Sequence, residues 1–243
     1  MILSDLAAVL ANCDPTFDVE QYRKAIIDTN VVGKDSLSSR QRTFRYLREM
    51  YALDLDVLEF RALLRLWRRD REGRPVVALL LAASRDAALA ATAPAVLQRP
   101  DGQAVTSADL ALAVEDHYPG SYSPAIRSKI GRNALSSWTQ AGYLNRVGRG
   151  PAVRIRHDPA ASAVAMALVL GTQDGLSGAR LFDSDAAQLL DAPNPTLHDR
   201  AHEASRKGWL DYRSRGSVTE IDVSALAAAA DDPRLPITEG NAR

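Results

Sequence analysis

The chain has 243 residues, of which 46% are hydrophobic and 25% are charged, as in ordinary soluble globular proteins. Its 30 basic residues balance its 30 acidic ones. No net charge therefore draws the whole molecule to nucleic acid or to an acidic membrane, and any such binding has to come from local segregation of charge. Arginine outnumbers lysine by 26 to 4, which favours bidentate phosphate and base contacts, although GC-rich codon usage explains the bias equally well.

Cysteine content and hydropathy exclude further classes of protein. Cys13 is the only cysteine, so the chain has neither an intrachain disulfide framework nor a cysteine zinc site. The N-terminal stretch MILSDLAAVLANCD lacks a charged leading region and meets Asp5 early, which argues against a signal peptide. The runs PVVALLLAA and AASAVAMALVLG are about half of the roughly 20 residues that a bilayer requires. We expect a cytoplasmic protein that has no membrane partner.

Residues 1–98 predict an N-terminal helical bundle. The stretch DSLSSRQRTFRYLREMYAL has Ser36 as a plausible N-cap. Four apolar side chains share one face of that helix: Leu37, Phe44, Leu47 and Tyr51. Two more helical runs, at about 75–84 and 85–97, complete the bundle, and RPDG at 99–102 is a turn signal that marks the first domain boundary.

Residues 103–157 predict a winged helix-turn-helix. A short extended segment leads into a first helix, and SPAIRSKIGRNALSSWTQAG follows as a longer second helix, with Ser123 as its cap and Pro124 at its first position. Gly142 ends that helix, because glycine adopts the left-handed conformation with least strain. YLNRV and AVRIRH then indicate two strands around a Gly148-Arg149-Gly150 turn.

The rest of the chain repeats this order. AGYLNRVGRGPAVRI at 141–155 matches KGWLDYRSRGSVTEI at 207–221. We therefore expect a connecting helix at 158–174, a second winged helix-turn-helix at 175–224, and a C-terminal helix with a flexible tail at 225–243. In the second module, GARLF is the expected first strand, DSDAAQLL the first helix, and PTLHDRAHEASRKG the second helix, capped by Asn194. The predicted fold class is mainly α with short β-hairpin wings.

The first module carries the candidate DNA-binding residues. The window 118–157 contains no Asp or Glu, and its seven basic residues are Arg127, Lys129, Arg132, Arg146, Arg149, Arg154 and Arg156. At about 100° per residue, the helix over 124–141 predicts a buried stripe through Ile126, Ile130, Ala134, Trp138 and Ala141. The opposite face carries Ser128, Arg132, Ser136 and Thr139, with Lys129 at its edge.

That face suits the DNA major groove, where Arg reaches guanine O6 and N7 and Ser reaches any base edge. The arginines of the hairpin would then meet phosphates. The alternative interpretation is a solvated basic surface, which any exposed helix can have. Possible secondary contacts come from Arg42 and Arg45 in the bundle, although acidic neighbours make a salt-bridged helix surface the better default there.

The second module differs on its outward helix face. Leu197, Ala201 and Ala204 mark the expected buried stripe, and the opposite face shows Asp199, His202, Glu203 and Arg206. Carboxylates directed at a groove would repel phosphates. This copy is expected to dock protein, or to make a weak phosphate contact through Arg213 and Arg215.

Nothing in the sequence assembles a catalytic site. His198 and His202 stand at i, i+4, but HDRAH lacks the glutamate of the metalloprotease motif and a third ligand. There is no phosphate-binding loop, nucleophile elbow or nuclease-like carboxylate cluster. We expect no enzyme activity, no metal, no cofactor and no small-molecule substrate.

Two stretches resemble a known family. TNVVGKDSLSSRQRTFRYLREMY at 29–51 and SPAIRSKIGRNALSSWTQAGYL at 123–144 are similar to the BrxA proteins of BREX bacteriophage-defence systems. The resemblance covers about residues 18–157, and the C-terminal third goes beyond it. It implies a non-catalytic DNA-binding component of a defence assembly, with a methyltransferase and other subunits of that system as partners.

Three functions remain open at this point. The first is binding of double-stranded DNA within a phage-defence complex, with little sequence specificity. The second is a protein–protein adaptor in which both modules dock other subunits, and the third is a stand-alone winged-helix transcription regulator. Salt-dependent DNA binding separates the first from the second, and a defined operator separates the third from both.

Overall fold

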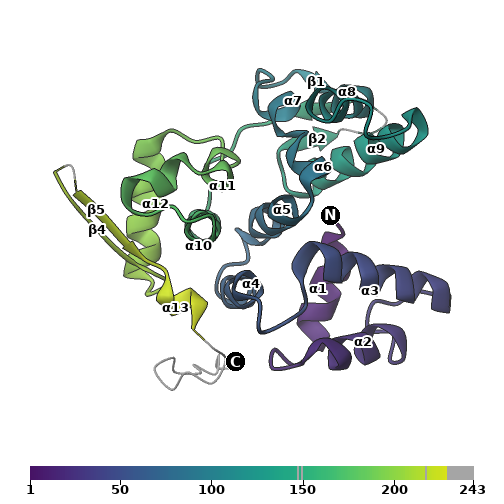
Figure 1. Cartoon of the computed structure of the whole chain (residues 1–243), viewed down its shortest axis with the longest axis horizontal. Helices are drawn as coiled ribbons and strands as arrows, with labels where there is room; N and C mark the ends of the chain where they lie inside the picture. Colours follow the sequence, from purple (N-terminus) through teal and green to yellow (C-terminus); the bar gives the residue numbers. More distant parts are fainter. Residues whose placement is uncertain (147, 149, 217, 229–243) are drawn as a thin grey trace.

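The computed structural model describes residues 1–146, 148, 150–216 and 218–228. The protein is mainly helical with small antiparallel sheets, as the sequence predicts. A bundle of helices forms the N-terminal part (Figure 1). Its helices are α1 (Leu3–Asn12), α2 (Val19–Ile27), α3 (Leu37–Tyr51), α4 (Leu58–Arg69), α5 (Arg74–Arg85), α6 (Ala87–Ala90) and α7 (Ala93–Leu97).

Local signals explain where these helices begin and end. The hydroxyl of Ser36 accepts a hydrogen bond from the backbone N–H of Ser39 at 3.2 Å, which confirms Ser36 as the N-cap of α3. The run predicted as one helix over 85–97 is divided into α6 and α7, because Pro94 has no N–H to donate and its ring would clash with the preceding turn. Leu37 is 52% exposed and does not join the buried face of α3.

The first predicted module has the expected order of elements. Strand β1 (Ala104–Val105) is followed by α8 (Ser107–His117), α9 (Pro124–Gln140), β2 (Leu144–Arg146) and β3 (Ala152–Arg154). The three strands form one antiparallel sheet in the order β1-β3-β2, with Val105 opposite Ala152 and Leu144 opposite Arg154. β3 is therefore central, and it ties the segment that leads into α8 to the segment that leaves α9.

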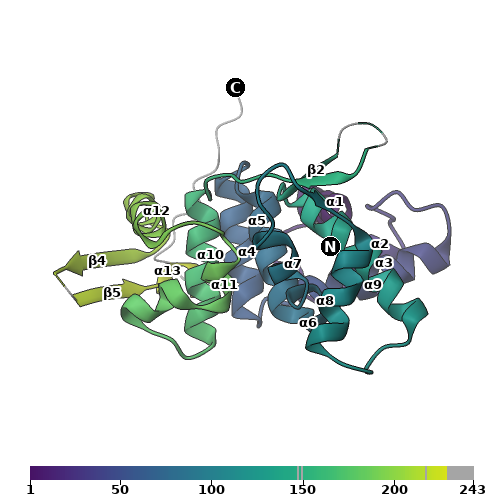
Figure 2. The ribbon, with the colours of Figure 1, turned by 90° about the horizontal axis from the view of Figure 1, so that it is seen from above.

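Helix α10 (Ala161–Gln173) joins the two halves of the molecule. Every residue from Ala161 to Gly171 is buried, because the helix packs against α4 and α5 on one side and against α11 and α12 on the other. Helices α4, α5 and α10 occupy the middle of the molecule in both ribbon views, with α9 and the β4–β5 hairpin at opposite ends of the long axis (Figures 1 and 2). One continuous apolar core runs from the N-terminal bundle through both predicted modules.

The second module begins with a 3₁₀ helix, η1 (Gly178–Asp183), and then has α11 (Asp185–Gln188), α12 (Asn194–Arg206), β4 (Asp211–Arg215), β5 (Val218–Asp222) and α13 (Ser224–Ala227). The prediction of a strand at GARLF is wrong. Leu181 and Phe182 are consecutive and both buried, whereas a strand would send neighbouring side chains to opposite faces. Asn194 is the first residue of α12 rather than its N-cap, which is Pro193.

The repeated sequence corresponds to a repeated helix ending. Gly142 (φ 88°) and Gly208 (φ 68°) both adopt the left-handed conformation that stops the helix. The two backbone bonds of the first ending run from Gly142 N–H to the Thr139 carbonyl (3.1 Å) and from Tyr143 N–H to the Trp138 carbonyl (3.0 Å). Those of the second run from Gly208 to Ser205 (2.9 Å) and from Trp209 to Ala204 (3.0 Å). The aromatic-Leu pair that follows is buried in both copies.

The two copies of the repeat differ in their hairpins. In the first, Arg146 pairs with Ala152, so five residues connect β2 and β3. In the second, Arg215 pairs with Val218, so two residues connect β4 and β5. The matched Arg-Gly pairs therefore hold different places in the sequence of the two hairpins. Arg149 and Gly150 are among the five connecting residues of the first, whereas Arg215 is the last residue of β4 in the second. Among the residues that the structure describes, the sheet of the second module consists of its two hairpin strands.

Within the described part of the chain, no single helix is long and apolar enough to cross a membrane; the bent pair Arg74–Arg85 and Ala87–Leu97 reaches that length and composition only when taken together.

Candidate nucleic-acid interface

The outward face of α9 holds the predicted base-reading residues. Helix α9 turns Gly131 towards α8 so closely that a Cβ atom there would lie 2.1 Å from the Ser107 carbonyl oxygen. Ala134 and Trp138 are buried on the same side. The opposite side is exposed, and it carries Ala125, Ile126, Ser128, Lys129, Arg132, Asn133 and Ser136. The prediction that Ser128, Lys129, Arg132 and Ser136 face outward is confirmed.

Two residues of this face depart from the predicted pattern. Ile126, expected in the buried stripe, is 50% exposed. Ile126 points outward because it lies about 140° around the helix from Gly131, which faces α8. Asn133 is also exposed, although it was not among the predicted contact residues. Periodicity did not reveal it, because a residue seven positions after Ile126 falls beside the stripe that was expected to be buried.

Hydrogen bonds divide the exposed face into two rows. In the first row, Arg132 donates from Nη1 to the Ser128 hydroxyl at 2.7 Å, and Gln140 donates from Nε2 to the Ser136 hydroxyl at 2.8 Å. The second row is Ile126, Lys129 and Asn133. Neither of its polar side chains has a hydrogen bond or ion pair with another described residue. The second row is thus free to bind a ligand.

Arg127 is engaged elsewhere in the fold. Its guanidinium forms an ion pair with Glu115 of α8, and the two side chains are 25% and 30% exposed. The hydrogen bond from Arg127 is the main cause that holds the pKa of Glu115 below its usual range, and the Gly120 N–H adds to it. The prediction that Arg127 binds DNA is therefore not favoured. The window 118–157, which contains no Asp or Glu, did not reveal this pairing because Glu115 lies just before it.

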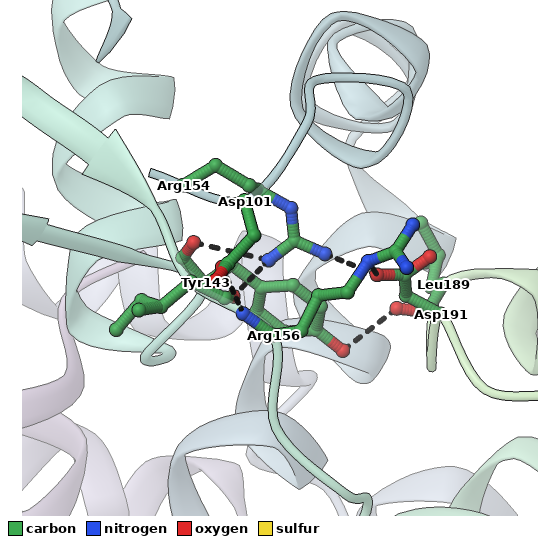
Figure 3. A network of polar contacts seen from close by, with 7 residues as sticks. Asp101, Tyr143, Arg154, Arg156, Leu189 and Asp191 are labelled. Atoms are coloured by element: carbon green, nitrogen blue, oxygen red, sulfur yellow. Dashed lines mark hydrogen bonds and ion pairs between the residues drawn. The ribbon is translucent and has the colours of Figure 1, made fainter. Parts of the chain in front are cut away.

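Arg154 contradicts the sequence prediction most clearly. It was expected on the hairpin surface facing phosphates, but its side chain has no exposed area. Along β3, Ala152 and Arg154 share the inward face, and Val153 is half-buried between them. The guanidinium donates to the carbonyls of Tyr143 and Ile155 and forms an ion pair with Asp191 (Figure 3).

This network fastens the first hairpin to the loop between α11 and α12. Besides binding Arg154, the Asp191 carboxylate lies 3.5 Å from Arg156 Nε. Tyr143 donates its hydroxyl to the Leu189 carbonyl at 2.7 Å (Figure 3). Asp191 itself has a positive φ of 49°, a conformation that Asp tolerates better than most residues. The first hairpin and the second module therefore share a buried polar junction.

The remaining basic residues of the hairpin are accessible to different degrees. Arg146, at the end of β2, is exposed and forms no ion pair with the described residues. Arg156 is 64% exposed, so it can reach a ligand in spite of Asp191. Arg149 lies outside the described residues. Lys129, Arg132, Arg146 and Arg156 are thus the described cations of the window that a phosphate or a base can reach.

The four arginines predicted as secondary DNA contacts are exposed, and their surroundings resemble those of other surface residues. Arg42 projects from α3 without a described partner. Arg45 lies 3.8 Å from Glu49 and over the Tyr46 ring at 5.1 Å, which is typical of a solvated helix surface. Arg213 and Arg215 project from β4, with Glu220 opposite Arg213 and Val218 opposite Arg215.

The outward face of α12 is less acidic than expected. Leu197, Ala201 and Ala204 are buried, as predicted. Asp199, His202 and Arg206 are exposed. Glu203 is less accessible than expected. It is half-buried, because Arg200 (2.9 Å) and Lys207 (2.7 Å) hold it from two sides. Only Asp199 remains as a free carboxylate on that face.

His198 belongs to an aromatic cluster. Its Nδ1 lies 2.5 Å from the Tyr212 hydroxyl, and its ring stacks on Phe182 with centroids 4.0 Å apart. Burial is the main cause that lowers the pKa of His198, which favours the neutral ring. Its contacts with Phe182 and Tyr212 indicate a packing role. Among the residues that the structure describes, no three His, Cys, Asp or Glu side chains gather as metal ligands would.

Comparison of the chain with models of protein families, with curated proteins and with solved structures finds no match in any of the three.

Proposed function

We propose that the protein is a non-catalytic component of a BREX-like bacterial anti-phage defence system that binds double-stranded DNA through its first module. In this proposal β1, α8, α9, β2 and β3 form a winged helix-turn-helix. The observation that supports it best is the exposed face of α9, where Lys129 and Arg132 stand beside short polar side chains on a 17-residue helix. A helix of this kind fits the major groove.

The sheet supports the same function. Because β2 leaves the end of α9 and pairs with β3, the hairpin is held beside the helix. Arg146 and Arg156 are accessible there, at positions suited to the phosphates that flank a groove. The second module, which lacks a third strand in the described residues, is proposed to dock a partner subunit, with at most a weak phosphate contact from Arg213 and Arg215.

The defence context rests on the sequence resemblance at 29–51 and 123–144. The proposed partners are accordingly a methyltransferase or other subunits of the same system. No small-molecule substrate, cofactor or membrane is part of the proposal.

Titration of a fluorescent duplex with the purified protein at several salt concentrations tests the DNA-binding function. Each neutralised phosphate contributes about −0.9 to the slope of log K against log salt, so four accessible cations give roughly −3 to −4. Arg146→Ala should weaken binding to all sequences and reduce the slope by about one. Arg206→Ala, an exposed arginine on α12, is the matched control and should bind like the wild type.

Two results would contradict this proposal. If the wild type binds no duplex at low salt, DNA is not its ligand. If Arg206→Ala impairs binding more than Arg146→Ala does, the second module rather than the first contacts DNA. Strict dependence on one defined operator, rather than a preference at a few base pairs, would instead favour a stand-alone transcription regulator.

The alternative is an adaptor subunit of the defence complex, and Leu112 of α8 favours it. Leu112 is 60% exposed and stands between two hollows of about 410 and 340 Å³, an arrangement suited to a protein surface. Under this alternative, Leu112→Asp abolishes co-purification with the other subunits while Lys129→Ala leaves it intact. Under the main proposal, Lys129→Ala impairs DNA binding while Leu112→Asp leaves it intact.

A further inference from the structure

The exposed row of Ile126, Lys129 and Asn133 on α9 is unusual for a surface helix. Ile126 is the one large apolar side chain of α9 that is exposed, at 50%. The Asn133 amide, which has two donor hydrogens and an acceptor oxygen, has no partner among the described residues. Neither residue contributes to the core that positions α9. Their exposure is therefore explained better by a ligand than by packing.

The neighbouring row does not offer the same freedom. Ser128 accepts from Arg132, and Ser136 accepts from Gln140, so both hydroxyls already have one partner along the helix. Arg132 is directed towards the N-terminal turns of α9 by its bond to Ser128. A base that approaches α9 thus finds Asn133 unengaged, whereas two of its polar neighbours have to release or share a hydrogen bond.

The chemistry of the two side chains matches one base pair type. An asparagine amide pairs bidentately with adenine, accepting from N6 and donating to N7 in the major groove. An aliphatic side chain contacts the C5 methyl group of thymine. On α9 the two residues are seven positions apart, about 10.5 Å along the axis, which is roughly three base-pair steps of 3.4 Å.

We propose that Asn133 and Ile126 are specificity-determining residues of α9, which select duplex DNA that presents an adenine to Asn133 and a thymine methyl group to Ile126. This inference rests on the proposed DNA-binding function and adds to it a preference for particular A·T pairs. Lys129, between them, contributes affinity without sequence preference, because a lysine ammonium is a compact charge suited to phosphate.

Chemical changes to the DNA test this without changing its phosphates. A preferred duplex is first selected from a random pool. It is then prepared with deoxyuridine in place of thymidine, which removes the C5 methyl groups, and separately with 7-deazaadenine, which removes N7. Affinity of the wild-type protein should fall about 2- to 10-fold on the first and 5-fold or more on the second, since a good bidentate pair corresponds to roughly 5- to 150-fold in affinity.

Three protein variants, each tested on the modified and unmodified duplexes, show which side chain makes each contact. Ile126→Ala should bind the deoxyuridine and thymidine duplexes equally, and Asn133→Ala should bind the 7-deazaadenine and adenine duplexes equally. Lys129→Ala is the matched control on the same row: it should weaken binding to every duplex and keep both differences. All three positions are exposed, and thermal unfolding should show that the variants remain folded.

The possible outcomes distinguish failure of this inference from failure of the proposed DNA-binding function. If the wild type binds duplexes in a salt-dependent manner but Ile126→Ala and Asn133→Ala keep the wild-type sensitivity to the modified bases, the inference is overturned and DNA binding stands. If the selected pool shows no A·T preference, the same conclusion follows. If the wild type binds no duplex at all, both fall together.

Discussion

Arg154 of the first hairpin and Asp191, 37 residues later in the sequence, form a buried ion pair that joins the two modules. The arginine has no exposed area and the carboxylate is 20% exposed. Arg154 cannot lose Asp191 without leaving a charge that water does not reach, whereas Asp191 also has Arg156 nearby. The pair is therefore a structural element, and the arginine contributes to the relative placement of the modules rather than to ligand contact.

Asp191→Asn should destabilise the protein by about 3 kcal/mol, because it leaves the buried guanidinium of Arg154 uncompensated. Arg154→Met should cost less, since Asp191 retains Arg156 nearby. The double variant should be more stable than Asp191→Asn alone. Urea unfolding monitored by circular dichroism gives the three values. An unchanged midpoint for Asp191→Asn would show that the pair contributes nothing to stability.

The two helix endings should respond alike to alanine. Gly142 and Gly208 have positive φ, and a Cβ at either position would meet no atom within 4 Å. Gly142→Ala and Gly208→Ala should therefore each cost about 1–2 kcal/mol through backbone conformation alone. Gly131→Ala is the steric contrast, since its Cβ would strike the Ser107 backbone, and we expect a loss of about 2–3 kcal/mol.

Urea midpoints of these three variants check the comparison. A neutral Gly208→Ala together with a costly Gly142→Ala would mean that the second helix ending tolerates an alternative conformation, and that the repeat is a likeness of sequence without a shared physical requirement.

Deletion of residues 175–243 should unfold more than the second module. The repeat in the sequence suggests that this part can be removed without harm to the first. However, α11 and α12 cover one side of α10, and Asp191 neutralises Arg154. We expect a shortened protein that aggregates or unfolds without cooperativity, as judged by size-exclusion chromatography and thermal melting. A monomeric product with a sharp melting transition would show that the first module is autonomous.

Stability should fall in mild acid in part because of His198. Burial and the neighbouring His202 lower its pKa in the folded state, so the unfolded chain binds a proton more readily. The stability that the folded protein owes to neutral His198 is therefore fully present above the unfolded pKa of about 6.5, and it is lost as the pH falls below that value. His198→Phe should reduce the difference in urea midpoint between about pH 7.5 and pH 5.5.

His117→Gln, which changes an exposed histidine, is the control and should keep the wild-type difference. Desolvation also lowers the pKa of His157, so some pH dependence should remain in His198→Phe. If His198→Phe retains the whole wild-type difference, the acid sensitivity arises elsewhere.

Periodicity and caps were enough to predict α9, the exposure of Ser128, Arg132 and Ser136, and both helix endings, because these depend on residues within a few positions of one another. Ser123, Pro124 and Gly142 fix the ends of the helix, and its small buried residues fix its orientation. The same reasoning placed Leu197, Ala201 and Ala204 on the buried side of α12.

Features that depend on distant partners were missed. The inward direction of Arg154 requires Asp191, and the pairing of Arg127 requires Glu115 on another helix. Nothing in the local sequence distinguishes an arginine that meets a carboxylate in the fold from one that meets solvent. The 3₁₀ helix at 178–183 was missed for a similar reason, since a short apolar run is compatible with a strand until its packing is known.

The central position of α10 has a consequence for synthesis of the chain. α5 ends at Arg85 and α10 begins at Ala161, and at roughly 5–20 residues per second a ribosome takes about 4–15 s to cross that interval. During that time the side of α5 that α10 later covers has no partner from its own chain. We therefore expect the N-terminal bundle to leave the ribosome with the apolar surface of α5 partly uncovered, and to stay exposed to aggregation until α10 has been synthesised.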